Sequence, residues 1–386
     1  MTFKRFTYCV ISLALCLCSS FVELSARDFD RYPAIVKLTD VKRVIATGDI
    51  HGALPQLQET LLAAGLIKKK AGSCKWHGGS SVWISLGDYV DRGDYSREVI
   101  EFIMEMSTQA RKAGGRVIPL MGNHEVMLLN GDVQRRAERE TRRKSKARLY
   151  GKTVDSFTRS GESFALVVSS RHPIGQFLRN LPVMAVINNR VGFVHGGFGE
   201  LTTLKEVEEK FRKCLATEDW FSPFLSPRTE EAAQASPIWA RHWWQNKAYV
   251  GRLLKALELR ELAFAHTPNG MVPRHLKDRH SKIRSYLKTS YAKMGKRRVK
   301  LYEKRLKSIE KEIHRLGSVI QTDGRLFNLD IGMCPWYEMS KGGCLEIVDH
   351  DGSATFRAIY PDKESKLLKA DPFEAKVIEG MEESLR

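Results

Sequence analysis

Short apolar runs alternate with longer amphipathic stretches in the first third of the chain. The runs Val41–Thr47, Ser81–Leu86 and Arg116–Met121 are rich in β-branched and aliphatic residues, which is typical of buried strands. Between them, Leu54–Leu66 and Tyr95–Ala113 repeat apolar residues at spacings of three and four, which predicts helices. This alternation favours parallel βαβ units, in which ligands bind beyond the carboxyl ends of the strands.

After residue 180 the apolar runs follow one another more closely. Two runs separated by Asn188-Asn189 predict a β-hairpin, and a further strand precedes His266. The predicted strands are Pro182–Ile187, Val191–Val194, Leu262–Ala265, Leu326–Ile331, Cys344–Val348 and Ala354–Tyr360. We expect them to form a second sheet that faces the first. The predicted fold class is therefore α/β, with two facing β-sheets flanked by helices.

The segment from about 275 to 317 interrupts this pattern as a basic helical insertion. Its apolar residues alternate spacings of three and four, as on a heptad stripe. The stripe consists of Val299, Tyr302, Leu306, Ile309, Ile313 and Leu316. Because so few heptads are present, we expect this helix to pack on its own domain or on a neighbouring helix rather than in an intermolecular coiled coil.

The net charge of +18 is concentrated in two segments. Residues 134–152 carry nine Lys or Arg against two Glu, and residues 279–315 carry fourteen against three, so net charges of +7 and +11 account for the whole excess. The basicity is therefore local and says little about chemistry elsewhere. An acidic surface or lipid is the favoured contact, and nucleic acid is disfavoured because aromatic residues are sparse among the basic ones. No pattern indicates an oligomeric state.

The N-terminus is typical of a signal peptide over residues 1–26. Lys4 and Arg5 precede the apolar run Cys9–Val22, and Leu24-Ser25-Ala26 offers a cleavage site. We expect the secretory route, to a secreted, periplasmic or endomembrane location, or membrane anchoring if the leader stays uncleaved. A catalytic domain over 27–360 and a tail over 361–386 would follow. The four cysteines beyond the leader match no zinc motif and allow either disulfides or free thiols.

Each of the first three predicted strands is followed by a glycine and then by a residue that can bind a metal ion. These blocks are Gly48-Asp49-Ile50-His51-Gly52, Gly87-Asp88-Tyr89-Val90-Asp91-Arg92-Gly93 and Gly122-Asn123-His124-Glu125. Residues two apart in extended chain point the same way, so Asp49 and His51 face together. Asp88 can bridge two ions because a carboxylate has two oxygens.

Further donors follow other strands: the Asn123 amide oxygen, and the imidazoles of His195 and His266. Mixed nitrogen and oxygen donors suit two divalent ions of Mn, Fe or Zn. A water molecule bridging two such ions would be acidified and supply hydroxide at neutral pH. The pattern therefore predicts a two-metal hydrolase site.

The three blocks match the GDxHG, GDxxDRG and GNHE motifs, and the chain resembles the phosphoprotein phosphatases of the calcineurin-like metallophosphoesterase superfamily over roughly residues 43–360. That resemblance implies the calcineurin-like metallophosphatase fold. It also implies that one metal is bound by Asp49, His51 and Asp88, and the other by Asp88, Asn123, His195 and His266.

The same resemblance implies roles in handling the substrate. His124 would be the general acid that protonates the leaving alcohol, oriented by Asp91, and Arg92 and Asn123 would hold the phosphate. Arg241 is the candidate for a second phosphate-binding arginine, and a solvent-exposed helical Arg is the alternative interpretation. These roles suit the chemistry, since an alkoxide is a poor leaving group and Arg binds phosphate through two donors.

The chain lacks the SAPNYC-type C-terminal loop of eukaryotic serine/threonine phosphatases. Its Val194-His195-Gly196-Gly197 and Trp239-Ala240-Arg241 blocks, together with the segment after Met333, are similar to the Shewanella-like protein phosphatases. That branch implies a phosphorylated protein or peptide as substrate, with phosphotyrosine among the candidates. The basic insertion and the basic segment at 134–152 depart from the family pattern.

We therefore expect a dinuclear-metal-dependent phosphomonoester hydrolase, a phosphoprotein phosphatase that uses a metal-bridging hydroxide with His124 as general acid. Two alternatives stay open. A basic rim also suits a bis(nucleosyl)-tetraphosphate or polyphosphate hydrolase with the same site. The basic helix would instead suit a binding protein that retains a relic metal site.

Overall fold

The computed structural model describes residues 27–268, 274–291, 294–316, 320–322, 324–337, 341–362 and 364–368. The predicted signal peptide and most of the predicted tail lie outside these ranges. Within them, no helix combines the length and apolar character that crossing a membrane requires. The cysteines Cys74, Cys214, Cys334 and Cys344 are all free thiols.

The first sheet has six strands and contains the parallel unit that the sequence predicts. In spatial order they are β14 (Lys366–Leu368), β13 (Ser353–Ile359), β12 (Cys344–His350), β2 (Arg43–Thr47), β5 (Val82–Ser85) and β6 (Arg116–Pro119). The strands β2, β5 and β6 run parallel, as expected. The strand β14 lies beyond residue 360, so the sheet continues into the segment for which the sequence predicts a tail.

The assignment of β12 and β13 to the second sheet was wrong. The strand β12 pairs antiparallel with β2, with Leu345 opposite Ala46, so both C-terminal strands extend the first sheet. Apolar patterning identifies a buried strand, but it does not specify which partner some 300 residues away will pair with it.

The second sheet also has six strands. Their spatial order is β1 (Ile35–Leu38), β7 (Met184–Ile187), β8 (Val191–Val194), β9 (Glu261–Phe264), β11 (Leu326–Asn328) and β10 (Ile320–Thr322). The predicted hairpin is β7–β8, and Asn188 and Asn189 both have positive φ, 53° and 48°. Such backbone angles are typical of a type I′ turn, which matches the twist of the paired strands. The edge strand β1 was not predicted.

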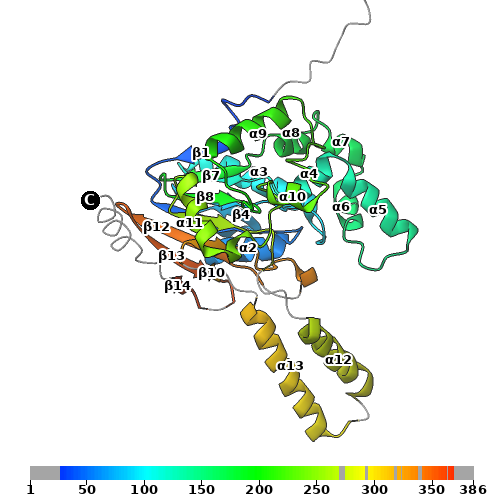
Figure 1. Cartoon of the computed structure of the whole chain (residues 1–386). Helices are drawn as coiled ribbons and strands as arrows, with labels where there is room; N and C mark the ends of the chain where they lie inside the picture. Colours follow the sequence, from blue (N-terminus) through cyan, green and yellow to red (C-terminus); the bar gives the residue numbers. More distant parts are fainter. Residues whose placement is uncertain are drawn as a thin grey trace, which may run out of the picture.

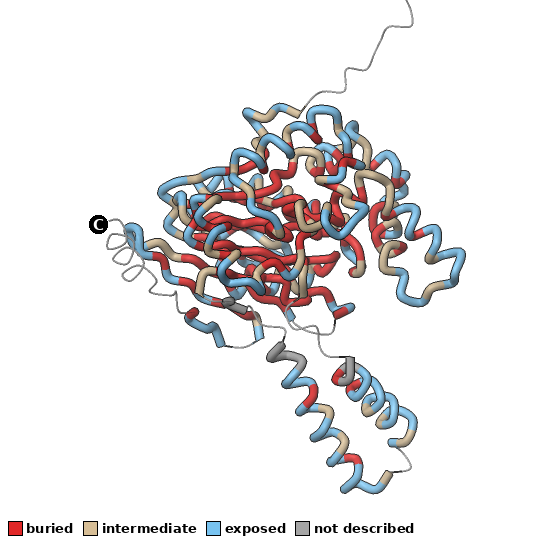
Figure 2. The backbone as a smooth tube through the Cα atoms, viewed as in Figure 1, coloured by how far each residue is buried: buried red, intermediate tan, exposed pale blue. Residues whose placement is uncertain are grey.

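The two sheets face each other and share an apolar core, as predicted. Across this core the rings of Phe327 in β11 and Phe356 in β13 stack with their centroids 4.7 Å apart. In Figure 2 the strands form the buried centre and the exposed residues lie on the surrounding helices and loops. The long helices that follow β2 and β5 are α2 (Leu54–Ala63) and α3 (Ser96–Lys112), close to the predicted bounds.

Shorter elements complete the body. A small hairpin, β3 (Ile67–Lys70) and β4 (Ser73–Trp76), follows α2. The remaining helices of the body are α4 (Asn123–Leu129), α5 (Asp132–Arg142), α6 (Gly151–Thr158), α7 (Phe164–Val168), α8 (Pro173–Arg179), α9 (Leu204–Ala216), α10 (Glu230–Gln234), η1 (Trp243–Gln245), α11 (Lys247–Ala256) and η3 (Pro335–Tyr337).

The basic insertion forms two helices, α12 (Arg274–Ser290) and α13 (Lys296–Leu316), that project together from the body (Figure 1). Val299 and Ile309 of the predicted stripe are buried, and the ring of Tyr302 lies 5.1 Å from that of Tyr286 in α12. The stripe therefore packs on a neighbouring helix. We call this pair of helices the basic hairpin.

Candidate metal centre and active site

The predicted metal ligands follow the carboxyl ends of strands from both sheets. In the first sheet, Asp49 follows β2, Asp88 follows β5, and Asn123 begins α4 after β6. In the second sheet, His195 follows β8 directly and His266 lies two residues after β9. All of these residues are buried. The facing of the two sheets thus brings five separate loops to one place.

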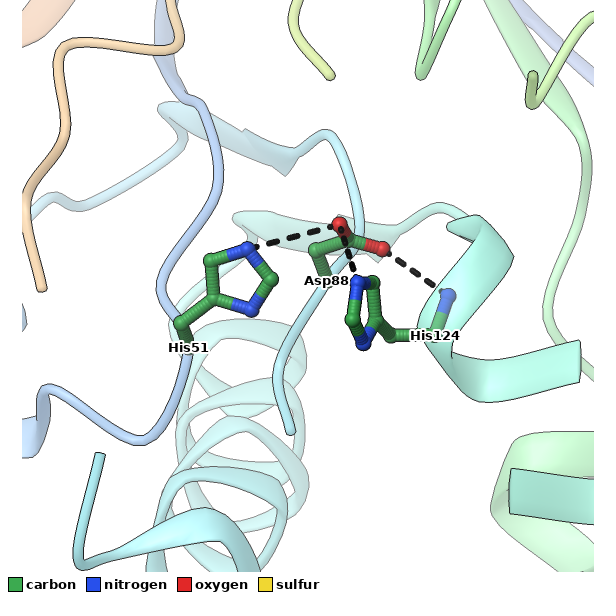
Figure 3. A group of neighbouring side chains, drawn as sticks. All are labelled: His51, Asp88 and His124. Atoms are coloured by element: carbon green, nitrogen blue, oxygen red, sulfur yellow. Dashed lines mark hydrogen bonds and ion pairs between the residues drawn. The ribbon is translucent and has the colours of Figure 1, made fainter. Parts of the chain in front are cut away.

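Asp88 lies at the centre of the group. Its Oδ2 is 3.5 Å from His51 Nε2 and 3.8 Å from His124 Nε2, so both rings point toward it (Figure 3). The other oxygen, Oδ1, is 3.3 Å from His195 Nε2. One carboxylate therefore faces two sets of donors through its two oxygens, which is the arrangement a bridging ligand needs.

The second set of donors lies around His195. Its Nε2 is 3.0 Å from Asn123 Oδ1, while its Nδ1 lies 2.8 Å from the backbone oxygen of Leu86. The ring of His266 is 4.9 Å away, centroid to centroid. Ligand atoms of Asp88, His195 and His266 all lie within 4.8 Å of one another. This set matches the predicted ligands of the second metal.

Asp49 joins the two sets. Its Oδ2 is 3.7 Å from His51 Nε2, and its Oδ1 is 3.7 Å from His195 Nδ1. Asp330, which follows β11, lies beside it and is fully buried. Burial, together with the carboxylates of Asp330 and Asp88, raises the pKa of Asp49. A nearby cation would relieve this crowding of negative charge.

The protonation states of the group suit metal binding. Burial lowers the pKa of His51, His195 and His266, so the neutral imidazole, which is the form that binds metals, is favoured. Burial acts to raise the pKa of Asp88, but the surrounding imidazoles together bring it below its usual range. Two buried polar atoms of the group, Nε2 of His266 and Oδ2 of Asp330, have no hydrogen-bond partner among the described residues.

The residues present therefore fit two divalent ions. His51, Asp88 and Asp49 could hold one of them, and Asp88, His195, His266 and Asn123 could hold the other. A ring nitrogen of His124 also lies close to the first set of donors, since possible ligand atoms of His51, Asp88 and His124 are all within 4.8 Å of one another. Its Nδ1, however, is already engaged by a different carboxylate.

That carboxylate belongs to Asp91. His124 Nδ1 lies 2.5 Å from Asp91 Oδ2, and Thr153 Oγ1 in α6 donates a 2.7 Å hydrogen bond to Asp91 Oδ1. The backbone N–H of Asp91 donates in turn to Thr153 Oγ1 and to Ser96 Oγ. A carboxylate that accepts a hydrogen bond from Nδ1 fixes the orientation of the ring and leaves Nε2 directed toward the cavity. This geometry suits the predicted general acid.

The loops that carry the site adopt unusual backbone angles. His51, Asp88, Asp91, Arg92 and His266 all have positive φ, between 48° and 70°. Residues other than glycine adopt this region at a cost, and such residues concentrate at functional sites. These residues lie in the turns that follow the strands, where their side chains gather around Asp88 beyond the strand ends.

Glu125 holds two of these loops together. Its carboxylate accepts hydrogen bonds from the backbone N–H groups of Asp88, Tyr89 and Gly122, each 2.8–2.9 Å long. A side chain at Gly122 would not fit, since a Cβ there would lie 2.4 Å from Asp88 Oδ1. The glycine therefore permits the close approach of the loops after β5 and β6.

The two predicted phosphate-binding arginines lie at the same cavity. Arg92 Nη1 contacts the ring of His51, and its guanidinium carbon is 5.5 Å from the centroid of the Tyr337 ring. Arg241 Nη1 donates a 2.6 Å hydrogen bond to the backbone oxygen of His266. The cavity measures about 280 Å³, and its lining comprises Asp49, Asp88, Arg92, His124, Leu149, Tyr150, Arg241, His266, Pro268, Trp336 and Tyr337. Every predicted site residue is thus in or directly behind this cavity.

The residues around the site that received no role from the sequence include Thr153, Glu125, Asp330 and Tyr337. Thr153 and Tyr337 carry no local signal, because their position depends on α6 and η3 folding back over the loops. Glu125 stands inside the third motif, and Asp330 follows an apolar run as the predicted ligands do. That second pattern could have identified Asp330.

This site and this pair of facing sheets define a metallophosphoesterase. The chain matches the family model described as calcineurin-like phosphoesterase over residues 42–270, more than half of its 386 residues, and it belongs to that family. The fold and family expected from the three motifs are thereby confirmed.

Among curated proteins, the chain is 37% identical over 91 residues to Shewanella-like protein phosphatase 2 of Arabidopsis thaliana. The matched stretch covers 24% of this chain and 22% of that protein. It is 25% identical over 254 residues to Shewanella-like protein phosphatase 1 of Plasmodium berghei, and this match covers 64% of this chain and 65% of that protein. The matched part is thus less than two thirds of either relative. The predicted resemblance to the Shewanella-like branch is confirmed.

Among solved structures, a cold-active protein-tyrosine phosphatase of a psychrophilic Shewanella species matches with a TM-score of 0.57 and 21% sequence identity, over 87% of this chain and 82% of that one. At this identity the match shows a shared fold.

Proposed function

We propose that this protein is a metal-dependent phosphomonoester hydrolase that acts on phosphorylated proteins or peptides. The observation that carries the proposal is the His124–Asp91 pair, whose free ring nitrogen faces Asp88 and the converging donors inside one cavity. Relatives named as protein phosphatases support the choice of substrate class.

Each group then has a chemical task. Two divalent ions, when bound by the Asp88-centred donors, would supply Lewis-acid stabilisation of the phosphoryl oxygens and a nucleophile at neutral pH. Arg92 and Arg241 would hold the phosphate through their paired N–H donors, with the Asn123 amide beside it. His124 would give its Nε2 proton to the leaving oxygen, and Asp91, in contact with Nδ1, would orient the ring for that transfer.

The two alternative functions are less well supported. The named relatives are protein phosphatases rather than hydrolases of nucleotides or polyphosphate, which disfavours the first alternative. A relic site would have no reason to keep the complete donor set together with the acid and both arginines. The proposal therefore keeps the enzyme and the phosphoprotein substrate.

Two finer points extend the proposal. Mn, Fe and Zn all suit the mixed imidazole and carboxylate donors, and we propose these as the candidate metals. We also propose export through the secretory route, on the basis of the charged and apolar N-terminal sequence. N-terminal sequencing of the mature protein would test the second point, and cleavage near residue 26 is expected.

The central test is turnover of p-nitrophenyl phosphate with Mn²⁺, with EDTA, and by Asp88→Asn. We expect activity with the metal, loss on chelation, and a loss of at least about 100-fold in the variant, since the central ligand loses its charge. The exposed Asp351→Asn is the matched control and should behave like the parent protein. An Asp88→Asn protein with parental rate and metal content would exclude the central role of Asp88.

A second comparison tests the substrate class. Phosphopeptides and diadenosine tetraphosphate are to be compared by kcat/KM under identical metal conditions. Higher kcat/KM for the phosphopeptides is expected, and a strong preference for the nucleotide would instead establish the first alternative.

A further inference from the structure

One basic segment lines the catalytic cavity, and the other begins a short distance along the chain from a residue that lines it. Leu149 and Tyr150, at the end of the 134–152 segment, line the cavity. Pro268 lines it as well and precedes the start of the basic hairpin at Arg274 by six residues. In Figure 1, α5 and the basic hairpin project from the right and the bottom of the molecule. Each of the two cationic extensions is therefore connected through the chain to residues that line the cavity.

The basic hairpin carries charge that the protein itself does not neutralise. Twelve Lys and Arg side chains of α12 and α13 are exposed, against four exposed Asp and Glu. None of these twelve forms an ion pair with a carboxylate among the described residues. Arg279, Lys282, Lys307 and Lys311 lie on the half of the hairpin nearer to the body. Such unpaired charge attracts an external polyanion.

The other basic segment is attached to the catalytic loop itself. The backbone N–H of Arg92 donates a 2.7 Å hydrogen bond to the backbone oxygen of Leu149. The Glu140 carboxylate accepts from the backbone N–H groups of Leu149, Tyr150 and Gly151, which fixes the end of the segment. Further basic side chains of this segment are exposed and form no ion pair with the described residues: Arg139, Arg142, Arg143, Lys144 and Lys146.

We propose that these two segments select phosphoproteins in which the phosphorylated residue lies within an acidic stretch. The inference rests on the proposed function and adds a substrate class to it. A phosphate bound between Arg92 and Arg241 would leave the flanking peptide to run outward past Tyr150 on one side and Pro268 on the other. Acidic residues on both flanks would then meet cationic side chains.

The expected contribution is mainly electrostatic. The basic side chains are exposed, so their attraction for the substrate falls as salt is added, with a Debye length of about 8 Å at 0.15 M ionic strength. Charge complementarity of this kind changes encounter and binding more than the chemical step. The effect should therefore appear in KM and kcat/KM, while kcat stays unchanged.

A lipid surface is the competing anionic partner. The position of the two segments favours the peptide, because Leu149 and Tyr150 of one segment line the cavity and Pro268, six residues before the basic hairpin, lines it as well. Binding to a membrane would not require that relationship. Lipid binding is accordingly an outcome of the test below.

The test uses two phosphotyrosine peptides of equal length, one flanked by Asp and Glu and the other by Ser and Ala, and a corresponding phosphoserine pair. We expect a KM about tenfold lower for the acidic member at low salt, with the difference shrinking as salt is raised. The variant R279Q/K282Q/K307Q/K311Q should lose most of that preference. The variant R142Q/R143Q/K144Q/K146Q should lose the part of the preference that comes from acidic residues on the other side of the phosphorylated residue.

The matched control is K37Q/K68Q/K70Q/K210Q, which removes the same charge from exposed side chains on β1, β3 and α9. Lys68 and Lys70 follow the far end of α2, about 15 Å of helix away from the His51 loop. This control should keep the full preference for the acidic peptide.

Three results distinguish the possibilities. No turnover of p-nitrophenyl phosphate by the parent protein would contradict the proposed function itself. Turnover without preference for the acidic peptide would overturn only the present inference. Loss of binding to phosphatidylserine vesicles in the hairpin variant, with an unchanged KM for the acidic peptide, would assign the charge to lipid and likewise overturn it.

Discussion

Thr153 Oγ1 donates a 2.7 Å hydrogen bond to Asp91 Oδ1, and both side chains are completely buried. The other oxygen of Asp91 is the one that lies 2.5 Å from His124 Nδ1. The helix α6, which begins at the end of the basic segment 134–152, thus fixes the carboxylate that orients the proposed general acid. Thr153 acts through Asp91, so it is a positioning residue.

Thr153→Val keeps the shape of the side chain but removes the hydroxyl. Hydrogen bonds to charged groups contribute about 1.5–3 kcal/mol, so we expect kcat to fall about tenfold or more. The drop should be larger for a phosphoserine peptide than for p-nitrophenyl phosphate. Thr108→Val, at an exposed position of α3, is the control. Equal losses for both substrates would mean that Thr153 supports the fold rather than the acid.

His124→Gln removes the proton donor. General acids contribute about 10²–10⁴-fold, so phosphoserine hydrolysis should fall by a factor in that range. p-Nitrophenyl phosphate should lose much less, because its leaving group is stable without protonation. Rates over a series of aryl phosphates would measure this dependence on the leaving group. A loss that is independent of the leaving group would assign His124 to metal binding instead.

Asp330→Asn removes the charge of a buried carboxyl group beside Asp49. Outer groups of this kind change metal affinity by about 10–100-fold, and we expect weaker binding in that range because one negative charge is lost. Titration of the metal-free protein with Mn²⁺, followed by calorimetry, would measure it. The exposed Asp351→Asn should leave the affinity unchanged. Parental affinity in Asp330→Asn would separate this residue from the metal centre.

Gly122→Ala tests the close approach of the two loops. A Cβ there would lie 2.5 Å from the backbone nitrogen of Asp88, so the loops must move apart, and we expect a loss of about 2 kcal/mol in the free energy of unfolding. Gly251→Ala, in the middle of α11, meets no atom within 4 Å and should stabilise the protein by about 0.5–1 kcal/mol. Urea denaturation of both variants measures the contrast. A neutral Gly122→Ala would show that the loops yield easily.

The sequence alone was sufficient for much of the site. The Gly-Asp and Gly-Asn blocks, His195 and His266 each follow an apolar strand, and parallel strands present their carboxyl ends at one edge of a sheet. That local rule placed Asp49, His51 and Asp88 together before any contact was known. Apolar periodicity also predicted α2, α3 and the β7–β8 hairpin, and it predicted that the heptad stripe packs on its own domain or on a neighbouring helix.

Only the tertiary structure decided which distant segments meet. The pairing of β12 with β2, the fold-back of α6 that brings Thr153 to Asp91, and the place of Asp330 beside Asp49 are contacts between residues far apart in the chain. Periodicity reports which face of an element is buried, but not what covers that face. For the same reason, the sequence showed two basic segments, and only the structure showed that one of them lines the cavity and that the other begins six residues after Pro268, which lines it.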